Sequence, residues 1–118
     1  MTIRNFLKTP LKAESIHEGA GLCEHSGILH ATDFDTPIRF LNYTIIPPGG
    51  SFGAHKHGDD NELYIILEGT GEYEQDGVTA PVEAGDIMVN ARFAVHGIKN
   101  TGAIPMRVLV IEAYNETH

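Results

Sequence analysis

Three potential metal ligands lie close together in the middle of the chain. His55 and His57 are one residue apart, and Glu62 follows at the start of an apolar run. Side chains at positions i and i+2 of a strand point to the same face, and their bases lie roughly 6–7 Å apart. Two imidazoles at this spacing can converge on one ion, and a carboxylate that opens the next strand can reach the same point. The pattern predicts a site for a first-row transition metal.

Short strands are the elements that must position these ligands. Gly, Pro and Asp-Gly turn signals recur at short spacing, and no helical period is convincing after residue 15. This pattern favours an all-β antiparallel sandwich or barrel. Asp76-Gly77 predicts a type I′ hairpin, because that turn needs positive φ at both central residues. The runs that we expect to form strands are 40–46, 63–68, 71–75, 78–82, 86–90, 95–99 and 106–114.

The N-terminal quarter of the chain is less regular. Residues 1–26 are expected to form an arm or edge strands, and residues 3–7 could form either. At 118 residues the chain is large enough for one core, and it shows no repeat, linker or low-complexity segment. We therefore expect a single domain, 1–118, with its core in 40–114.

A second group of spaced residues lies between positions 85 and 100. Gly85 opens a predicted strand, His96 follows eleven residues later, and Asn100 closes the segment. With this group the chain resembles the cupin superfamily, in particular its small single-domain microbial members. The fixed positions of the first cupin motif correspond to Gly49, His55, His57, Glu62 and Gly69. Gly85, His96 and Asn100 match the second motif, but Ala91 stands where Pro is usual and Phe93 where Gly is usual.

The resemblance implies a jelly-roll-like β-barrel, also described as a double-stranded β-helix, with one divalent metal inside. The ligands that it implies are His55, His57, Glu62 and His96. From the residues alone, His96 is only a histidine on a strand. Manganese, iron, nickel, copper and zinc all suit imidazole and carboxylate ligands. Cupin-like sites leave coordination positions open for water, substrate or dioxygen, so the resemblance is compatible with catalysis.

Two functions are compatible with such a site. The first is an enzyme that acts on a small oxygenated or sugar-like molecule, of the isomerase, epimerase or dioxygenase type. The second is a non-catalytic module that binds a sugar or a small acid. Tyr64 shares strand parity with Glu62 and is the candidate catalytic residue, with core packing as the alternative. Phe93 is a candidate cap for the site.

Several other side chains are candidates for lining the site or binding a ligand. Arg39 and Arg92 could hold an anionic ligand near the mouth, although surface salt bridges are the simpler expectation. Ile66 shares parity with Glu62, and Met88 and Asn90 share a face of their own strand. The three histidines that lack ligand spacing are expected at the surface: His17, His25 and His30.

The composition of the chain limits the classes of partner and the cellular location that we expect. The formal net charge is −8, which argues against nucleic acid and anionic membranes, since both need a basic footprint. The single cysteine, Cys23, excludes an intramolecular disulfide. No apolar run reaches the length of a membrane-spanning helix, and we expect a cytoplasmic protein. Sheet edges and the apolar side chains within residues 1–26 predict a homodimer. The cupin-like site predicts a small-molecule ligand.

Overall fold

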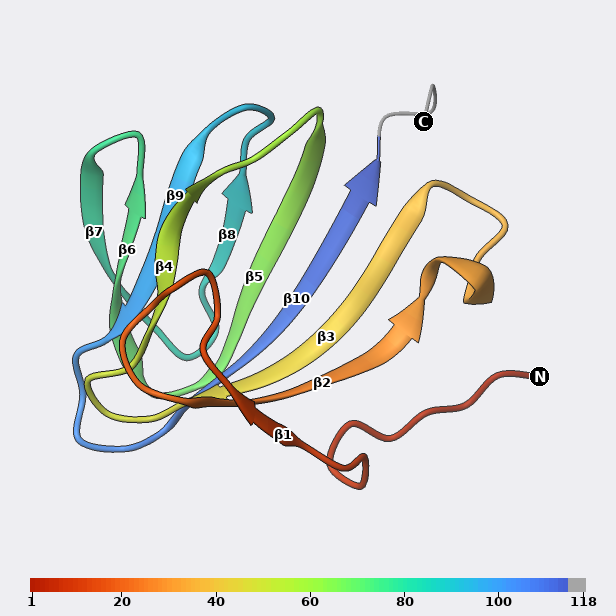
Figure 1. The fold of residues 1–118 in the computed structure, drawn as a ribbon, viewed down its shortest axis with the longest axis horizontal. Helices are drawn as coiled ribbons and strands as arrows, with labels where there is room; N and C mark the ends of the chain where they lie inside the picture. The colour runs from red at the N-terminus through yellow and green to blue at the C-terminus, as the bar shows by residue number, and fades with distance from the viewer. Residues whose placement is uncertain (115–118) are drawn as a thin grey trace.

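Two antiparallel sheets face each other and close a barrel (Figure 1). The computed structural model describes residues 1–114. The first sheet has the order β1 (Lys12–Glu14), β2 (Cys23–His30), β3 (Ile38–Ile46), β10 (Met106–Tyr114), β5 (Asp60–Glu68) and β8 (Ile87–Asn90). The second has the order β4 (Ser51–Lys56), β9 (Val95–Asn100), β6 (Thr70–Gln75) and β7 (Val78–Glu83). The predicted all-β barrel is confirmed.

The seven predicted strands correspond to β3 and to β5 through β10, with bounds shifted by up to three residues. Asp76 and Gly77 have φ of 50° and 81°, as the predicted hairpin turn between β6 and β7 requires. Two strands, β2 and β4, lie outside the predicted runs, whereas β1 falls within residues 1–26 as an edge strand, one of the two alternatives expected there. The segments that form β2 and β4 contain Gly27 and Gly53 and several polar residues, so their strand signal is weak. Residues 3–7 form no strand and belong to an arm.

Helical structure is nearly absent from the described residues. A 3-10 turn, η1 (Ala31–Asp33), follows β2. Within residues 1–114, no helix is long and apolar enough to cross a membrane.

Alternation along the central strands separates the barrel interior from its outer surface. Along β10, residues from Met106 to Glu112 alternate between buried and half-buried. The inward side chains of β5 and β10 are buried, and Tyr64, Ile66 and Val108, each at most 1% exposed, belong to the core. The outward side chains of these strands stay half-buried, so the outer surface of the sheet retains apolar area.

The segment between β1 and β2 is tied to β4 by backbone contacts (Figure 1). The Gly53 amide donates to the Ile16 carbonyl at 3.1 Å, and the Ser51 amide donates to the Ala20 carbonyl at 3.0 Å. A Cβ on Gly53 would lie 1.9 Å from the carbonyl oxygen of His17, so only glycine permits this approach. The contact places residues 15–19, which we call the strap, over the opening between the two sheets.

Candidate metal centre

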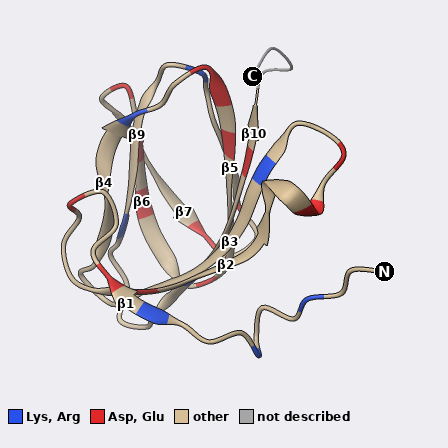
Figure 2. Cartoon of the chain, turned by 45° about the vertical axis from the view of Figure 1, so that its right-hand side comes forward, with Lys and Arg blue, Asp and Glu red and all other residues tan. Residues whose placement is uncertain are grey.

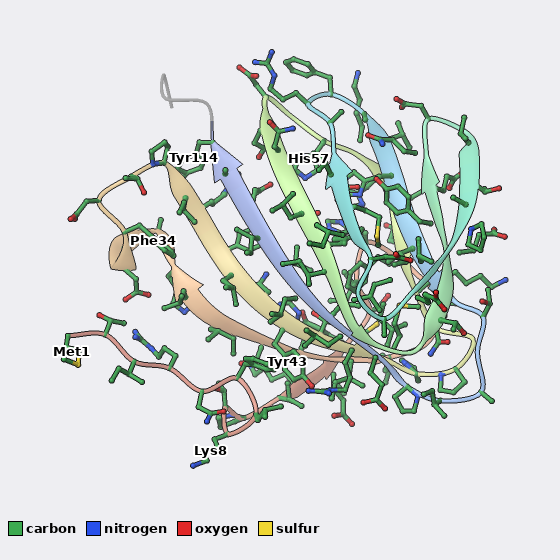
Figure 3. The ribbon with its side chains drawn as sticks, turned by 180° about the vertical axis from the view of Figure 1, so that it is seen from behind. Met1, Lys8, Phe34, Tyr43, His57 and Tyr114 are labelled. Carbon is green, nitrogen blue, oxygen red and sulfur yellow. The ribbon has the colours of Figure 1, made fainter. Side chains whose placement is uncertain are left out.

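Three strand segments bring the four predicted ligands together. His55 lies on β4 directly opposite His96 on β9, and His57 follows the end of β4. Glu62 comes from β5 in the facing sheet. One donor atom from each of the four lies within 4.8 Å of the others. The carboxylate oxygens of Glu62 are 3.6 Å from His57 Nε2 and 3.8 Å from His96 Nε2. Figure 3 labels His57, whose side chain lies between the two sheets.

Each of the three histidines uses its Nδ1 atom for a hydrogen bond within the protein. The Nδ1–H of His55 donates to the Gly53 carbonyl at 3.0 Å, since a carbonyl can only accept. The Nδ1 of His57 bonds to the Asp60 carboxylate, and the Nδ1 of His96 bonds to the Tyr64 hydroxyl at 3.0 Å. A carbonyl and a carboxylate only accept, so Nε2 is the lone-pair nitrogen of His55 and His57. The same holds for His96 when the Tyr64 hydroxyl donates to Glu62 and accepts from Nδ1. Metal-ligating histidines in proteins are oriented in this way.

Burial favours the neutral form of His55 and His96. Desolvation, reinforced by the neighbouring His55 and His57, lowers the pKa of His96 to about 3. Desolvation also lowers the pKa of His55. His96 is fully buried, and its Nε2 is one of two buried side-chain N or O atoms without a hydrogen-bond partner in the described residues. A neutral imidazole with an unpartnered nitrogen is the form that binds a metal, so the residues present fit a divalent cation.

Tyr64 links two of the four residues. Its ring is 1% exposed, and its hydroxyl bonds both to His96 and to the Glu62 carboxylate. Burial raises the pKa of Glu62, while His57 and Tyr64 oppose that shift. The pKa of Tyr64 itself is raised well above its usual value by burial and by Glu62. Tyr64 therefore stays protonated and orients the His96 ring. Its candidate role in catalysis stays a prediction.

A second acidic cluster adjoins the site. His57, Asp60 and Glu112 are all buried and could themselves converge on an ion. Glu112 Oε1 lies 3.4 Å from His57 Nε2. Burial raises the pKa of Glu112 to about 8, and its hydrogen bond to Asp60 adds to the shift. Arg39 reaches both carboxylates, at 3.5 Å and 3.4 Å. Figure 2 shows this basic position on β3 beside the acidic ends of β5 and β10.

Two cavities that share lining residues adjoin the cluster of four residues. The mouth cavity, about 450 Å³, is bordered by Arg39, Asp60 and Glu112 together with His55 and His57. The inner cavity, about 330 Å³, extends along β3 and β2. Three residues line both: His17, Phe40 and Glu62. A ligand of an ion held here can therefore extend in either direction.

The other candidate residues from the sequence have different positions in the structure. Ile66, Met88 and Asn90 are buried as their shared strand faces predict, and Arg92 pairs with Asp59 at 2.8 Å on the surface. The prediction that Phe93 caps the site is wrong, because Phe93 is 57% exposed and lines neither cavity. Its φ of 63° explains why glycine is usual there.

Sequence reasoning missed two histidines that line the cavities. His17 is exposed on the strap, yet its ring stacks on His55 with centroids 3.5 Å apart. His25 lies half-buried in the inner cavity, where its Nδ1 bonds to Thr44 Oγ1 at 2.7 Å. Placing both at the surface was therefore incomplete. For His30 the expected surface position is confirmed, because it is exposed and lines neither cavity. Strand parity could have indicated His25 only if β2 had been recognised.

A closed pair of antiparallel sheets that carries three histidines and one glutamate inside defines a small β-barrel with a potential metal site. The cupin domain family model matches residues 42–112, and the chain belongs to this family. The matched range contains all four residues of the site.

Relatives of known structure or curated description agree with that assignment. An oxalate-binding protein of Thermotoga maritima is 31% identical over 111 residues, which cover 94% of this chain and 92% of that protein. The crystal structure of a predicted oxalate decarboxylase from the same organism matches 97% of this chain and all of its own, with a TM-score of 0.93 and 27% identity. A 5-nitrosalicylic acid 1,2-dioxygenase of Bradyrhizobium sp. is 34% identical over 87 residues, and the matched region covers 74% of this chain and 39% of that enzyme.

Proposed function

We propose that this cupin holds one divalent transition metal on His55, His57, Glu62 and His96. The observation that carries the proposal is the hydrogen bonding of the three rings, each of which uses Nδ1 within the protein and turns Nε2 toward the site. Manganese, iron, nickel, copper and zinc all suit this donor set. Four protein ligands leave positions open on a metal of higher coordination number.

The metal proposal is tested by measuring bound metal per chain. We expect the untagged protein, reconstituted anaerobically, to bind one equivalent of at least one of these ions, and His57→Ala to lose it. His30→Ala is the matched control, because His30 is exposed and touches neither cavity. Equal metal content in the two variants would contradict the placement of the site.

The ligand that we propose for the open positions is a small carboxylic acid of the oxalate class. Two observations support it: the relative described as oxalate-binding, and the cation at the mouth supplied by Arg39. A bound metal would supply Lewis acidity to a carboxylate oxygen. Arg39, half-exposed beside Asp60 and Glu112, would attract the anion to the mouth cavity.

Isothermal titration of oxalate into metal-loaded protein tests the ligand class. We expect one site per chain, no binding to the metal-free protein, and weaker binding by Arg39→Gln. Glyceraldehyde or another neutral small sugar serves as the comparison ligand. A protein that binds the sugar and ignores oxalate would favour the sugar-binding alternative.

Catalysis is the second candidate function, and Glu112 favours it. Its buried carboxyl borders the mouth cavity next to His57, at a place where it can hold or give a proton to a bound acid. Decarboxylation, isomerisation and dioxygenation would each use a metal-bound oxygenated substrate. Turnover is tested by following oxalate and formate by NMR. Saturable oxalate binding without product over many hours would leave the binding function alone.

The homodimer that we propose uses the outer surface of the six-stranded sheet. Leu63 and Ile65 of β5 lie in register with Val89 and Ile87 of β8 and with Ile111 and Leu109 of β10. These six side chains, which we call the outer face, form a continuous apolar band without a charged residue, and a second copy of the chain can bury it sheet against sheet. Nearby, the Phe6 ring of the arm packs against Tyr43, with ring centroids 4.8 Å apart.

Light scattering at micromolar concentration tests the dimer. We expect twice the chain mass for the protein and for Val78→Lys, which changes an exposed residue outside the outer face. We expect the mass of one chain for Ile65→Lys. A wild-type protein with the mass of one chain would contradict the proposal. The same sample can be used to examine the proposed single cupin domain, since limited proteolysis should leave residues 40–114 intact.

A further inference from the structure

The inner cavity is larger than a metal-bound two-carbon acid requires. Its volume is about 330 Å³. Oxalate has six non-hydrogen atoms. If each atom took up the volume of one water in the liquid, roughly 30 Å³, oxalate would occupy about 180 Å³. The mouth cavity offers further space on the other side of Glu62. The inner cavity can therefore accommodate a longer molecule that starts at the metal site.

Strand register shows how the inner cavity is built. In the facing sheet, Glu62 and Phe40 both pair with Glu112 and form the row of side chains next to the site. Two residues further along the strands, Tyr64 and Asn42 both pair with Val110. Two residues further again, Thr44 pairs with Val108 on one side and with His25 on the other. Each row lies about 7 Å beyond the last.

The chemistry of the lining changes along this path. The apolar walls are Phe40 in the row next to the site, Val110 in the second row, where it pairs with Asn42, and Phe52. The deeper end is polar. Asn42 and Thr44 project from β3, and Thr44 is fully buried with its hydroxyl hydrogen-bonded to the His25 ring. Apolar walls with a few placed polar groups are typical of small-molecule sites.

The polar groups at the deep end lie two strand rows beyond the site, further than oxalate bound to a metal there would reach. An inward threonine and histidine stand here, whereas the hydrophobic core is built from aliphatic, aromatic and sulfur-containing side chains. Burying polar groups in this position costs free energy unless they are hydrogen-bonded. Glu14 also lines this end, with its Oε1 3.9 Å from His25 Nε2. A ligand that reaches Asn42 and His25 would therefore meet hydrogen-bonding groups beside one carboxylate.

We propose, on the basis of the function proposed above, that the inner cavity is a subsite for the body of an acid longer than oxalate. The ligand class is a 2-oxo or 2-hydroxy carboxylic acid, which chelates at the metal through its acid end. Its planar apolar body lies between Phe40, Phe52 and Val110, and a terminal hydroxyl or carboxyl group hydrogen-bonds with Asn42 or His25. The strap closes this space from outside through Ile16 and His17.

The test is a ladder of acids titrated into the full-length, metal-loaded protein: oxalate, pyruvate, phenylpyruvate and 4-hydroxyphenylpyruvate. Pyruvate carries the same 2-oxo acid end as the two aromatic acids. We expect phenylpyruvate to bind at least tenfold more tightly than pyruvate, and the 4-hydroxyl group to add a further several-fold.

Two variants locate the effect. Val110→Phe fills the inner cavity and is expected to remove the preference for both aromatic acids, while oxalate and pyruvate bind as before. Thr44→Val changes one buried hydroxyl with little change of volume, and is expected to remove only the gain from the 4-hydroxyl group, because His25 loses its partner. If Val110→Phe does not fold, Thr44→Val and the ladder itself still decide the question.

Failure of the subsite and failure of the proposed function give different results. If oxalate and pyruvate bind but the aromatic acids bind no more tightly, or if their advantage survives both substitutions, the subsite is refuted and small-acid binding stands. If the metal is held and no acid binds, small-acid binding is refuted and the subsite with it.

Discussion

Replacing Tyr64 with Phe separates the role of its hydroxyl in the metal site from its role in the core. The substitution removes one oxygen from a side chain that is 1% exposed, and with it the 3.0 Å hydrogen bond to His96 Nδ1. The buried Nδ1–H then has no partner, which costs about 1–3 kcal/mol of stability. The His96 ring also loses the contact that fixes its tautomer. Loss of such a partner weakens metal binding by about 10- to 100-fold, which is about 1.4–2.8 kcal/mol.

The matched control is Tyr73→Phe. Tyr73 also points into the barrel, its ring centroid lies 6.2 Å from that of Tyr64, and its hydroxyl donates to a buried acceptor, Asn90 Oδ1. Removing this oxygen should destabilise the metal-free protein by a similar amount, but it touches none of the histidines.

Two measurements on each variant separate an effect on stability from an effect on metal affinity. Urea unfolding in a chelator gives the stability of the metal-free protein, and competition with a chromophoric chelator at pH 7.5 gives the metal affinity. We expect both variants to lose stability and only Tyr64→Phe to lose affinity. Equal affinities, with stability lowered in both, would refute the argument that Tyr64 positions His96.

Three further substitutions test other parts of the structure. Gly53→Ala places a Cβ 1.9 Å from the His17 carbonyl. It should displace the strap, cost about 2 kcal/mol in urea unfolding, and speed ligand dissociation in stopped-flow, whereas an unchanged protein would contradict the close contact. Phe93→Gly relieves a left-handed backbone at an exposed residue and should raise stability by up to about 1 kcal/mol, the strain relieved less the entropy of glycine. Glu112→Gln tests the buried carboxyl. Its pKa of about 8 lies above the ordinary 4.5, so the metal-free protein loses stability as pH rises from 4.5 to 8. The melting temperature of the variant should fall less than that of the wild type between pH 5 and pH 8.5, and parallel curves would contradict the shift.

The grouping of the four candidate ligands could be predicted because its members are either close in sequence or fixed by motif spacing. His55 and His57 need only one strand to share a face, and Glu62 opens the next. His96 needed the family resemblance, because nothing within its own strand says that it lies opposite His55. The strands of the second half, with their β-branched runs and Asp-Gly turn, were predicted for the same reason: their signals are local.

The rest of the site depends on contacts between distant segments. Glu112 faces Glu62 only through the register of β10 with β5, which periodicity along one strand does not contain. His17 reaches His55 because a glycine on β4 admits the strap at backbone distance. His25 lies on β2, whose polar residues and glycine conceal its strand character.

These long-range contacts account for what would distinguish this chain from other barrels with the same four ligands. The rings of His55, His57 and His96 are each fixed through Nδ1 by a carbonyl, a carboxylate or a phenol. Those partners determine which nitrogen faces the site, and they are compatible with many reactions. Ligand choice depends instead on the surrounding walls. The mouth cavity presents Arg39 and Glu112, and the inner cavity runs about 14 Å along β3 to a polar end. A chelating acid that used both the metal and that end would be selected by its length, which a site for oxalate alone could not do.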